Sequence, residues 1–296
     1  MKLALVVNDK KIEAVKCAAR IIKMFSEDGV EVGMNRQNAK TMESIDLQIA
    51  ANVECFENHS LLAGWCDFAV TVGGDGTIIH MAKHAALAGK PIVGVNVGRV
   101  GFAAELETYE ISELKKIIVS DYNTEKSYNT EKRMLLDVCV KKGDREKTFI
   151  AVNDAVISRE GLSRIIDMEV SLNGENFCCY RGDGVLFSTP TGSTAYSLSA
   201  GGPIVDPNMS CLIMTPLCPY SLFSRSVVLS DKAQLSIKVH SPDNSTGFLT
   251  IDGQESEEIL DDDIITVKCS SVYLSMIHLK DKNFYRLLKE KLPRSE

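Results

Sequence analysis

The sequence lacks any run of about 18 consecutive apolar residues, which is the length that a membrane-spanning helix requires. The opening segment MKLALVV is shorter than the apolar region of a signal peptide, and Asp9, Lys10 and Lys11 interrupt it. We therefore expect a cytoplasmic protein that does not use a membrane as a partner.

An excess of positive charge is also absent: 33 Lys and Arg stand against 40 Asp and Glu, which gives a formal charge of −7. This balance argues against a nucleic acid as a partner. Hydrophobic residues make up 45% of the 296 residues and charged residues 25%, as in ordinary globular proteins. At roughly 150 residues per domain, the length predicts two domains.

C-x-x-C pairs are missing too, although there are nine cysteines. Their odd number and irregular spacing favour neither a disulfide framework nor a zinc site. We expect nine reduced thiols, most of them packed as small hydrophobic groups.

The first hundred residues alternate between two periodicities. Short apolar runs predict buried strands, at 3–7, 30–34, 68–72 and 91–95. Apolar positions spaced three and four residues apart predict helices, over 12–25, 39–51 and 77–87. Such alternation indicates a parallel sheet covered by helices on both faces, which is a Rossmann-like α/β domain that we place over residues 1–105.

The remainder of the chain is typical of antiparallel β structure. Expected strands lie at 134–140, 147–157, 166–172, 175–180, 227–229, 234–240, 248–251 and 264–269. Asn173-Gly174 is a strong hairpin signal, and the acidic run 255–263 is interpreted as a solvated loop. We expect a β-rich, sandwich-like domain over 106–275, and a C-terminal helix, within 276–296, that packs on the first domain.

The segment Gly73-Gly74-Asp75-Gly76-Thr77 lies between an expected strand and an expected helix. Its glycines let a ligand approach the main chain, and the exposed N–H groups at the helix start favour a phosphate. A carboxylate at this place suits phosphoryl transfer to an alcohol, since it can accept the hydroxyl proton. The alternative is a simple strand–helix turn in which Asp75 caps the helix.

A second polar segment runs from Arg181-Gly182-Asp183-Gly184 to the stretch 188–197, which is rich in Ser and Thr. Its hydroxyl and backbone groups suit a purine and a ribose, and Tyr196 can add an aromatic wall. His80 and His84 are spaced as metal ligands can be, but no third ligand is nearby, so they are interpreted as helix-surface residues.

These segments resemble the motifs of the NAD kinase family. The matching motifs are GGDGT at 73–77, NVGRVGF at 96–102, VND at 152–154, RGDG at 181–184, TPTGSTAYS at 189–197, GGP at 201–203 and IDG at 251–253. GGDGT is shared with lipid kinases, but its combination with TPTGSTAY is specific. The resemblance implies transfer of a phosphoryl group to the 2′-hydroxyl of the adenosine ribose of NAD, with a divalent cation such as Mg²⁺ assisting.

The resemblance also implies roles for individual residues. Asp75 would face the ribose hydroxyl as general base or orienting acceptor. Substrate-binding positions are implied for Gly74, Gly76, Phe102, Asn153, Asp154, Asp183, Thr194, Ala195, Tyr196, Ser199 and Asp252. Asp154 stands where the family usually has Glu, so its ribose contact is expected to be longer or bridged by water.

Four points stay open on the sequence alone. The phosphoryl donor is ATP or inorganic polyphosphate, and NADH is a possible second acceptor. The resemblance implies a homo-oligomer, a dimer or a tetramer, with Asp183 near the subunit interface. The alternatives to an NAD kinase are a diacylglycerol-type lipid kinase that shares GGDGT and a non-catalytic nucleotide sensor.

Overall fold

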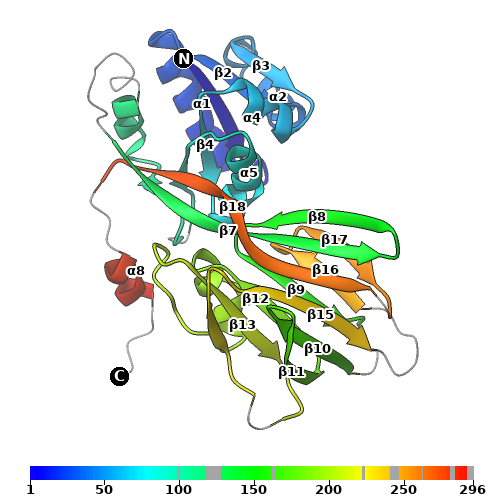
Figure 1. Ribbon diagram of the computed structural model, residues 1–296. Coiled ribbons are helices and arrows are strands. Elements are labelled where there is room, and N and C mark those ends of the chain that lie inside the picture. Colours follow the sequence, from blue (N-terminus) through cyan, green and yellow to red (C-terminus); the bar gives the residue numbers. More distant parts are fainter. Residues whose placement is uncertain are drawn as a thin grey trace. The chain divides into compact units, whose positions relative to one another are not determined.

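The computed structural model describes residues 1–98, 101–117, 128–161, 165–221, 224–240, 247–261, 263–280 and 284–291. The chain forms two compact units, which are Met1–Lys132 together with Leu274–Glu296, and Arg133–Tyr273 (Figure 1). As expected, the first unit is an α/β structure and the second is β-rich.

The N-terminal unit is built on a parallel sheet. Its strands are β1 (Lys2–Val7), β2 (Glu31–Asn35), β3 (Val53–Phe56), β4 (Phe68–Gly73), β5 (Ile92–Asn96) and β6 (Leu106–Glu107). Paired neighbours follow the order β6-β5-β4-β1-β2-β3. Every residue of β4 and β5 is buried, which explains their continuous apolar sequences, because helices cover both faces of the sheet.

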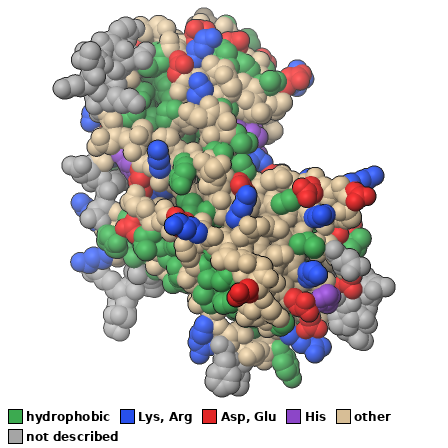
Figure 2. Space-filling model, in the orientation of Figure 1, with side chains coloured by type: hydrophobic (Ala, Val, Ile, Leu, Met, Phe, Trp, Pro, Cys, Tyr) green, Lys and Arg blue, Asp and Glu red, His purple; other side chains and the backbone are tan. Residues whose placement is uncertain are grey.

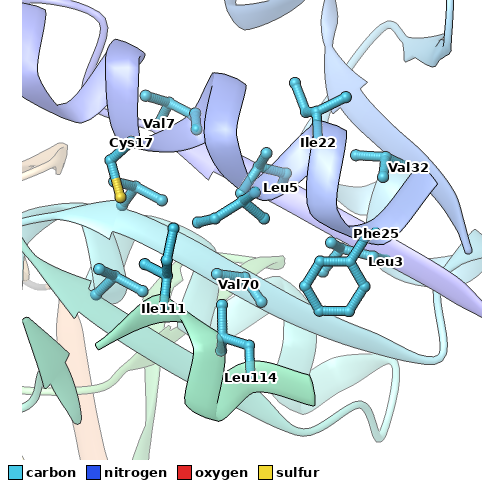
Figure 3. Close-up of a cluster of buried hydrophobic side chains, with 14 of the residues drawn as sticks. Leu3, Leu5, Val7, Cys17, Ile22, Phe25, Val32, Val70, Ile111 and Leu114 are labelled. Carbon is cyan, nitrogen blue, oxygen red and sulfur yellow. The ribbon is translucent and has the colours of Figure 1, made fainter. Parts of the chain in front are cut away.

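The helical elements of this unit are α1 (Ile12–Glu27), α2 (Arg36–Glu43), α3 (Leu47–Ala50), α4 (His59–Trp65), α5 (Asp75–Leu87), η1 (Ile111–Leu114) and α8 (Phe284–Lys291). Figure 3 shows the cluster in which Cys17, Ile22 and Phe25 of α1 meet Leu5 and Val70 of the sheet. Helices α4 and α5 contact β1 and β4 without joining this cluster, so they cover the opposite face.

Segment 106–117 belongs to the N-terminal unit. Leu106 pairs with Val95 in the parallel sheet, and Ile111 and Leu114 of η1 lie in the cluster of Figure 3. The expected domain division places this segment in the second domain instead. A two-residue strand and a single helical turn carry too little periodicity to reveal this placement from sequence.

The C-terminal unit contains two antiparallel sheets. Its strands are β7 (Asn129–Lys142), β8 (Arg145–Ala151), β9 (Asp154–Arg159), β10 (Ile166–Leu172), β11 (Glu175–Gly182), β12 (Gly184–Ser188), β13 (Cys211–Leu217), β14 (Val227–Ser230), β15 (Gln234–His240), β16 (Gly247–Ile251), β17 (Glu255–Ile259) and β18 (Ile264–His278). One sheet has the order β14-β13-β12-β9-β16-β17, and β11-β10-β15-β18 and the β7–β8 hairpin belong to the other. Val170 and Ile237 of one sheet share a core with Ile157 and Phe187 of the other.

Strands β7 and β18 are common to both units, and residues 129–132 of β7 belong to the N-terminal unit. The first part of β18 pairs with β15, whereas its last residues belong to the N-terminal unit, where Met276 pairs with Ile92 of β5.

Three further sequence expectations differ from the structure. The expected strand 147–157 is two strands, because the chain breaks at Val152 and Asn153. The acidic run contains edge strand β17, whose Glu257 lies 2.8 Å from Lys142 Nζ and 2.7 Å from Lys147 Nζ. The expected helix 39–51 is replaced by the shorter α2 and α3.

Candidate functional site

The Gly-rich turn joins β4 to α5 in the N-terminal unit. A Cβ atom on Gly73 would lie 2.2 Å from Thr77 Oγ1, so this glycine is required by close packing. A Cβ atom on Gly74 or Gly76 would meet nothing within 4 Å. Backbone on the first turn of α5 is therefore open to a ligand, and its N–H groups favour an anion.

Asp75 is the first residue of α5, yet its carboxylate does not cap this helix. Oδ2 accepts a hydrogen bond from Phe102 N at 2.8 Å, and Oδ1 accepts one from Ala103 N at 3.2 Å. A Cβ atom on Gly101 would lie 1.9 Å from Asp75 Oδ1, so only glycine allows this approach. The loop 101–103 thus fixes the orientation of the carboxylate, and the alternative of Asp75 as a helix cap is wrong.

A pocket of about 450 Å³ opens beside this turn, at the carboxyl ends of β1 and β2. Such an edge is the usual ligand-binding edge of a parallel α/β sheet. The lining includes Asn8, Lys10, Lys11, Gln37, His59, Gly74, Gly76, Thr77 and His80.

The charged side chains that line the pocket are Asp9, Lys10 and Lys11. Lys11 Nζ donates to Val97 O at 2.7 Å, which places its positive charge at the pocket wall. Burial, together with His80, His84 and Lys83, lowers the pKa of His59 to about 4, so this imidazole is neutral at pH 7. Its Nε2 accepts a hydrogen bond from Asn35 Nδ2 at 2.8 Å.

In the C-terminal unit, Asp252 organises the segment that precedes β9. This residue has a φ of 51° and begins the turn after β16. Its carboxylate accepts hydrogen bonds from Val152 N, Asn153 N and Asp154 N, at 2.9, 2.7 and 3.0 Å. Asp252 N donates back to Asp154 O at 2.9 Å. Asp252 therefore acts on the Asn153–Asp154 pair through the backbone.

The Asp154 side chain lies in a buried environment, and the residue is only 5% exposed. Burial in the first place, and the neighbouring Asp252 carboxylate in the second, raise the pKa of Asp154 to about 7. At neutral pH this carboxyl group can therefore donate or accept a hydrogen bond.

The Ser/Thr-rich loop packs on the same segment. Thr189 Oγ1 donates to Val152 O at 2.7 Å and accepts from Gly192 N at 3.0 Å. A Cβ atom on Gly192 would lie 2.1 Å from Asn153 O, so this glycine permits the close contact of the two loops. Further along the same loop, Thr194 and Ala195 are half-buried, and Tyr196 and Ser199 are exposed.

The structure brings some expected site residues together and separates others. Asn153, Asp154 and Asp252 are joined by hydrogen bonds, as are Asp75 and the backbone of Phe102. Asp183 precedes β12, at the end opposite to Ser188, which pairs with Asp154. Five strand residues separate these ends by roughly 17 Å. Asp183 instead accepts a hydrogen bond from Arg159 Nε at 2.6 Å.

Sequence reasoning missed the contributions of Gly101, His59 and Lys11. Gly101 lies in the NVGRVGF motif but was given no role, and His59 and Lys11 lie in no motif. Their partners lie 24 to 86 positions away in the chain. Arg99 and Val100 of the NVGRVGF motif lie outside the described residues.

Among the described residues, no three His, Cys, Asp or Glu side chains gather as metal ligands do. Within the same residues, no helix has the length and apolar character needed to cross a membrane. On the face shown in Figure 2, basic and acidic side chains are interspersed.

Family models match both parts of the chain. The ATP-NAD kinase N-terminal domain matches residues 3–122, and the ATP-NAD kinase C-terminal domain matches residues 152–279. An NAD kinase of Acetivibrio thermocellus is 34% identical over 293 residues, covering 99% of this chain and 97% of the relative. An NAD kinase of Caldanaerobacter subterraneus is 42% identical over 228 residues, covering 76% and 78%.

Two solved structures share the fold. A yeast NADH kinase complexed with NADH has a TM-score of 0.86 at 24% identity and covers all of this chain and 89% of its own. An NAD kinase from Archaeoglobus fulgidus in complex with ATP has a TM-score of 0.70 at 26% identity, with 98% of each chain covered.

Proposed function

The chain belongs to the NAD kinase family and catalyses phosphoryl transfer to NAD. From this premise we propose that Asp75 orients the hydroxyl group of the acceptor and accepts its proton. The observation that carries this assignment is the Asp75 carboxylate, held by Phe102 N and Ala103 N next to the open backbone of Gly74 and Gly76. The lipid kinase and the nucleotide sensor have no support among the related proteins.

In the proposed reaction, the 2′-oxygen of the adenosine ribose attacks the terminal phosphorus of the donor. A bond from the ribose oxygen to phosphorus forms, and the bond from phosphorus to the leaving phosphate oxygen breaks. Asp75 orients the hydroxyl and accepts its proton as the new bond forms. Open N–H groups at the start of α5 stabilise the charge on the transferred group.

We assign the donor's phosphates to the pocket beside the Gly-rich turn. Its volume of about 450 Å³, its Lys10 and Lys11 side chains and the adjoining helix start suit a chain of phosphates. ATP is the donor that the related structure with ATP supports. Polyphosphate would need the same two lysines, and NADH is a second acceptor to be tested.

A divalent cation, Mg²⁺, is part of the proposal. The described residues contain no ligand cage, so the cation would be held mainly by the donor's phosphates and by water, which is how Mg²⁺ is commonly bound. It would offset negative charge on the donor.

The acceptor's ribose is assigned to Asn153 and Asp154, and its base and linking phosphates to Thr194, Ala195, Tyr196 and Ser199. Support comes from the hydrogen bonds of Asp252 and Thr189, which hold the backbone of 152–154. Asp252 and Asp183 then contribute by ordering their neighbours.

We also propose a cytoplasmic homo-oligomer. All nine cysteines are free thiols, which is usual in a reducing compartment. Strand β11 ends the larger sheet and carries an exposed Phe177, and such an edge favours association with a second subunit.

A turnover assay tests the proposed function. Purified protein is offered NAD or NADH with ATP or polyphosphate, with and without Mg²⁺, and NADP or NADPH is measured. We expect NADP from NAD and ATP in the presence of Mg²⁺, and little product without the cation. Turnover that is unchanged without any divalent cation would contradict the assignment of Mg²⁺.

A further inference from the structure

The N-terminal unit contains a buried carboxylate, Glu105, that the proposed reaction does not use. The residue is 3% exposed. Its Oε1 accepts hydrogen bonds from Leu279 N at 3.0 Å and Lys280 N at 2.9 Å, and its Oε2 lies 3.3 Å from His278 Nδ1. A buried carboxylate is tolerated only with such partners, because burial otherwise disfavours its charge.

His278 lies between two carboxylates. Its Nε2 is 2.6 Å from Glu131 Oε2, on the side of the ring away from Glu105. These two hydrogen-bonding carboxylates, which outweigh burial, raise the pKa of His278 to about 9. The ring is therefore an imidazolium at neutral pH and donates from both nitrogens. We call the set Glu105, His278 and Glu131 the clasp.

The clasp adjoins the loop that holds Asp75. Phe102 and Ala103 donate to the Asp75 carboxylate, and Glu105 follows after a single further residue. Glu105 N donates to Gly94 O at 2.9 Å, and a Cβ atom on Gly94 would lie 3.1 Å from Ala104 Cα. The backbone of residues 104 and 105 is therefore packed tightly against β5. The loop 101–104 is thus fixed by Asp75 at one end and by the clasp at the other.

We propose that Glu105 and His278 are positioning residues for phosphoryl transfer, which hold the loop 101–104 so that its amides aim the Asp75 carboxylate at the acceptor hydroxyl. This inference rests on the proposed role of Asp75. Neither residue touches substrate. Their effect passes through the backbone, and a displacement of about 1 Å at a reacting group costs on the order of 100-fold in rate.

The first variant is Glu105→Gln, which keeps an oxygen for Leu279 N and Lys280 N but removes the charge that faces His278. We expect kcat to fall about 10-fold while KM for NAD changes less than about twofold, because positioning acts in the transition state. Amides in segment 101–104 should exchange with deuterium faster. Asp28→Asn is the control, since it removes the exposed ion pair of Asp28 with Lys115, 2.8 Å away in the same unit.

A double-mutant cycle separates this inference from the proposed function. If Glu105 acts through Asp75, then Glu105→Gln should change kcat less than about twofold in the Asp75→Asn background. Equal losses in both backgrounds, or a lower Tm with unchanged kcat, would overturn the positioning role and leave Asp75 intact. Normal kcat in Asp75→Asn alone would overturn the proposed function and the positioning role together.

His278→Asn is the second variant, in case Glu105→Gln does not fold. Its amide nitrogen can still donate to Glu105, but it carries no charge and does not reach Glu131. We expect a smaller fall in kcat, about threefold to fivefold, again with KM retained. A kcat equal to that of the parent protein in this variant would count against the clasp.

Discussion

Asp75 is held by the amides of a loop 27 positions further along the chain, and not by its own helix. A capping carboxylate accepts hydrogen bonds from the first N–H groups of its own helix. The Asp75 carboxylate instead accepts hydrogen bonds from Phe102 N and Ala103 N, which lie outside α5. Orientation of the acceptor hydroxyl is the role that this arrangement serves best.

The substitution Asp75→Asn tests that role at the scale of one residue. The amide is nearly isosteric, so the fold and NAD affinity should be retained. Loss of the proton acceptor should lower kcat at least about 100-fold. Steady-state kinetics and NAD titration measure both quantities, and near-normal kcat with normal NAD binding would make Asp75 a structural turn residue.

Asp154 gives a second prediction, on stability. Its pKa is about 7 in the folded protein against an ordinary 3.8, so the folded state keeps a proton that the unfolded chain releases. Stability from this residue is therefore lost as pH rises from about 4 to 7. The variant Asp154→Asn has no such charge, and its Tm should exceed that of the parent by about 3 °C or more at pH 8, and by less at pH 5.

The same substitution should weaken the ribose contact. We expect KM for NAD to rise about 5- to 10-fold with little change in kcat, because such a contact serves ground state and transition state alike. A Tm difference that is the same at pH 5 and pH 8 would contradict the buried, perturbed carboxyl group.

At the scale of elements, the loop 101–103 is joined to the first turn of α5 by the hydrogen bonds of Asp75. In Gly101→Ala the added methyl group would overlap Asp75 Oδ1, so the loop must move and release the carboxylate. We predict a fall in kcat of about 10- to 100-fold. Gly64→Ala is the matched control, since a Cβ atom there meets nothing within 4 Å and alanine favours helix α4. Full activity in Gly101→Ala would show that this contact is not used in turnover.

Elements with strong local signals were predictable from sequence. Strands β1, β4 and β5 have continuous apolar runs, and the β10–β11 hairpin follows from Asn173-Gly174, whose φ angles are 53° and 87°. Strand β17 was not predictable, because its acidic sequence resembles a solvated loop. Its Glu257 forms ion pairs with Lys142 and Lys147, which lie over 100 positions away in the chain. Strand β3 and helix α4 are short and were missed as well.

The candidate site divides in the same way. Its motifs are local and name Asp75, Asn153 and the 189–197 loop directly. Their interactions are not local. Asp252 binds amides about 100 positions away, and Glu105 binds amides 174 and 175 positions away. No periodicity or turn signal in one sequence encodes such pairs.

For the whole molecule, the prediction concerns assembly. If edge strand β11 forms the subunit interface, Phe177→Glu should place a charge in it and dissociate the oligomer. Light scattering at assay concentration should then give a dimer or tetramer for the parent protein and a smaller mass for the variant. Leu61→Lys, at an exposed position on α4, serves as the control and should keep the parent mass. A monomeric parent with full activity would contradict the oligomer.

The return of residues 274–280 to the N-terminal unit has a consequence for how the chain is made. On the ribosome, Glu105 emerges long before Leu279 and Lys280, whose amides it binds. The first unit therefore cannot complete its own interior while the β-rich unit is being synthesised between its two parts. Because of this order of translation, the N-terminal unit, which carries Asp75, can complete its folding only after the whole β-rich unit has been synthesised.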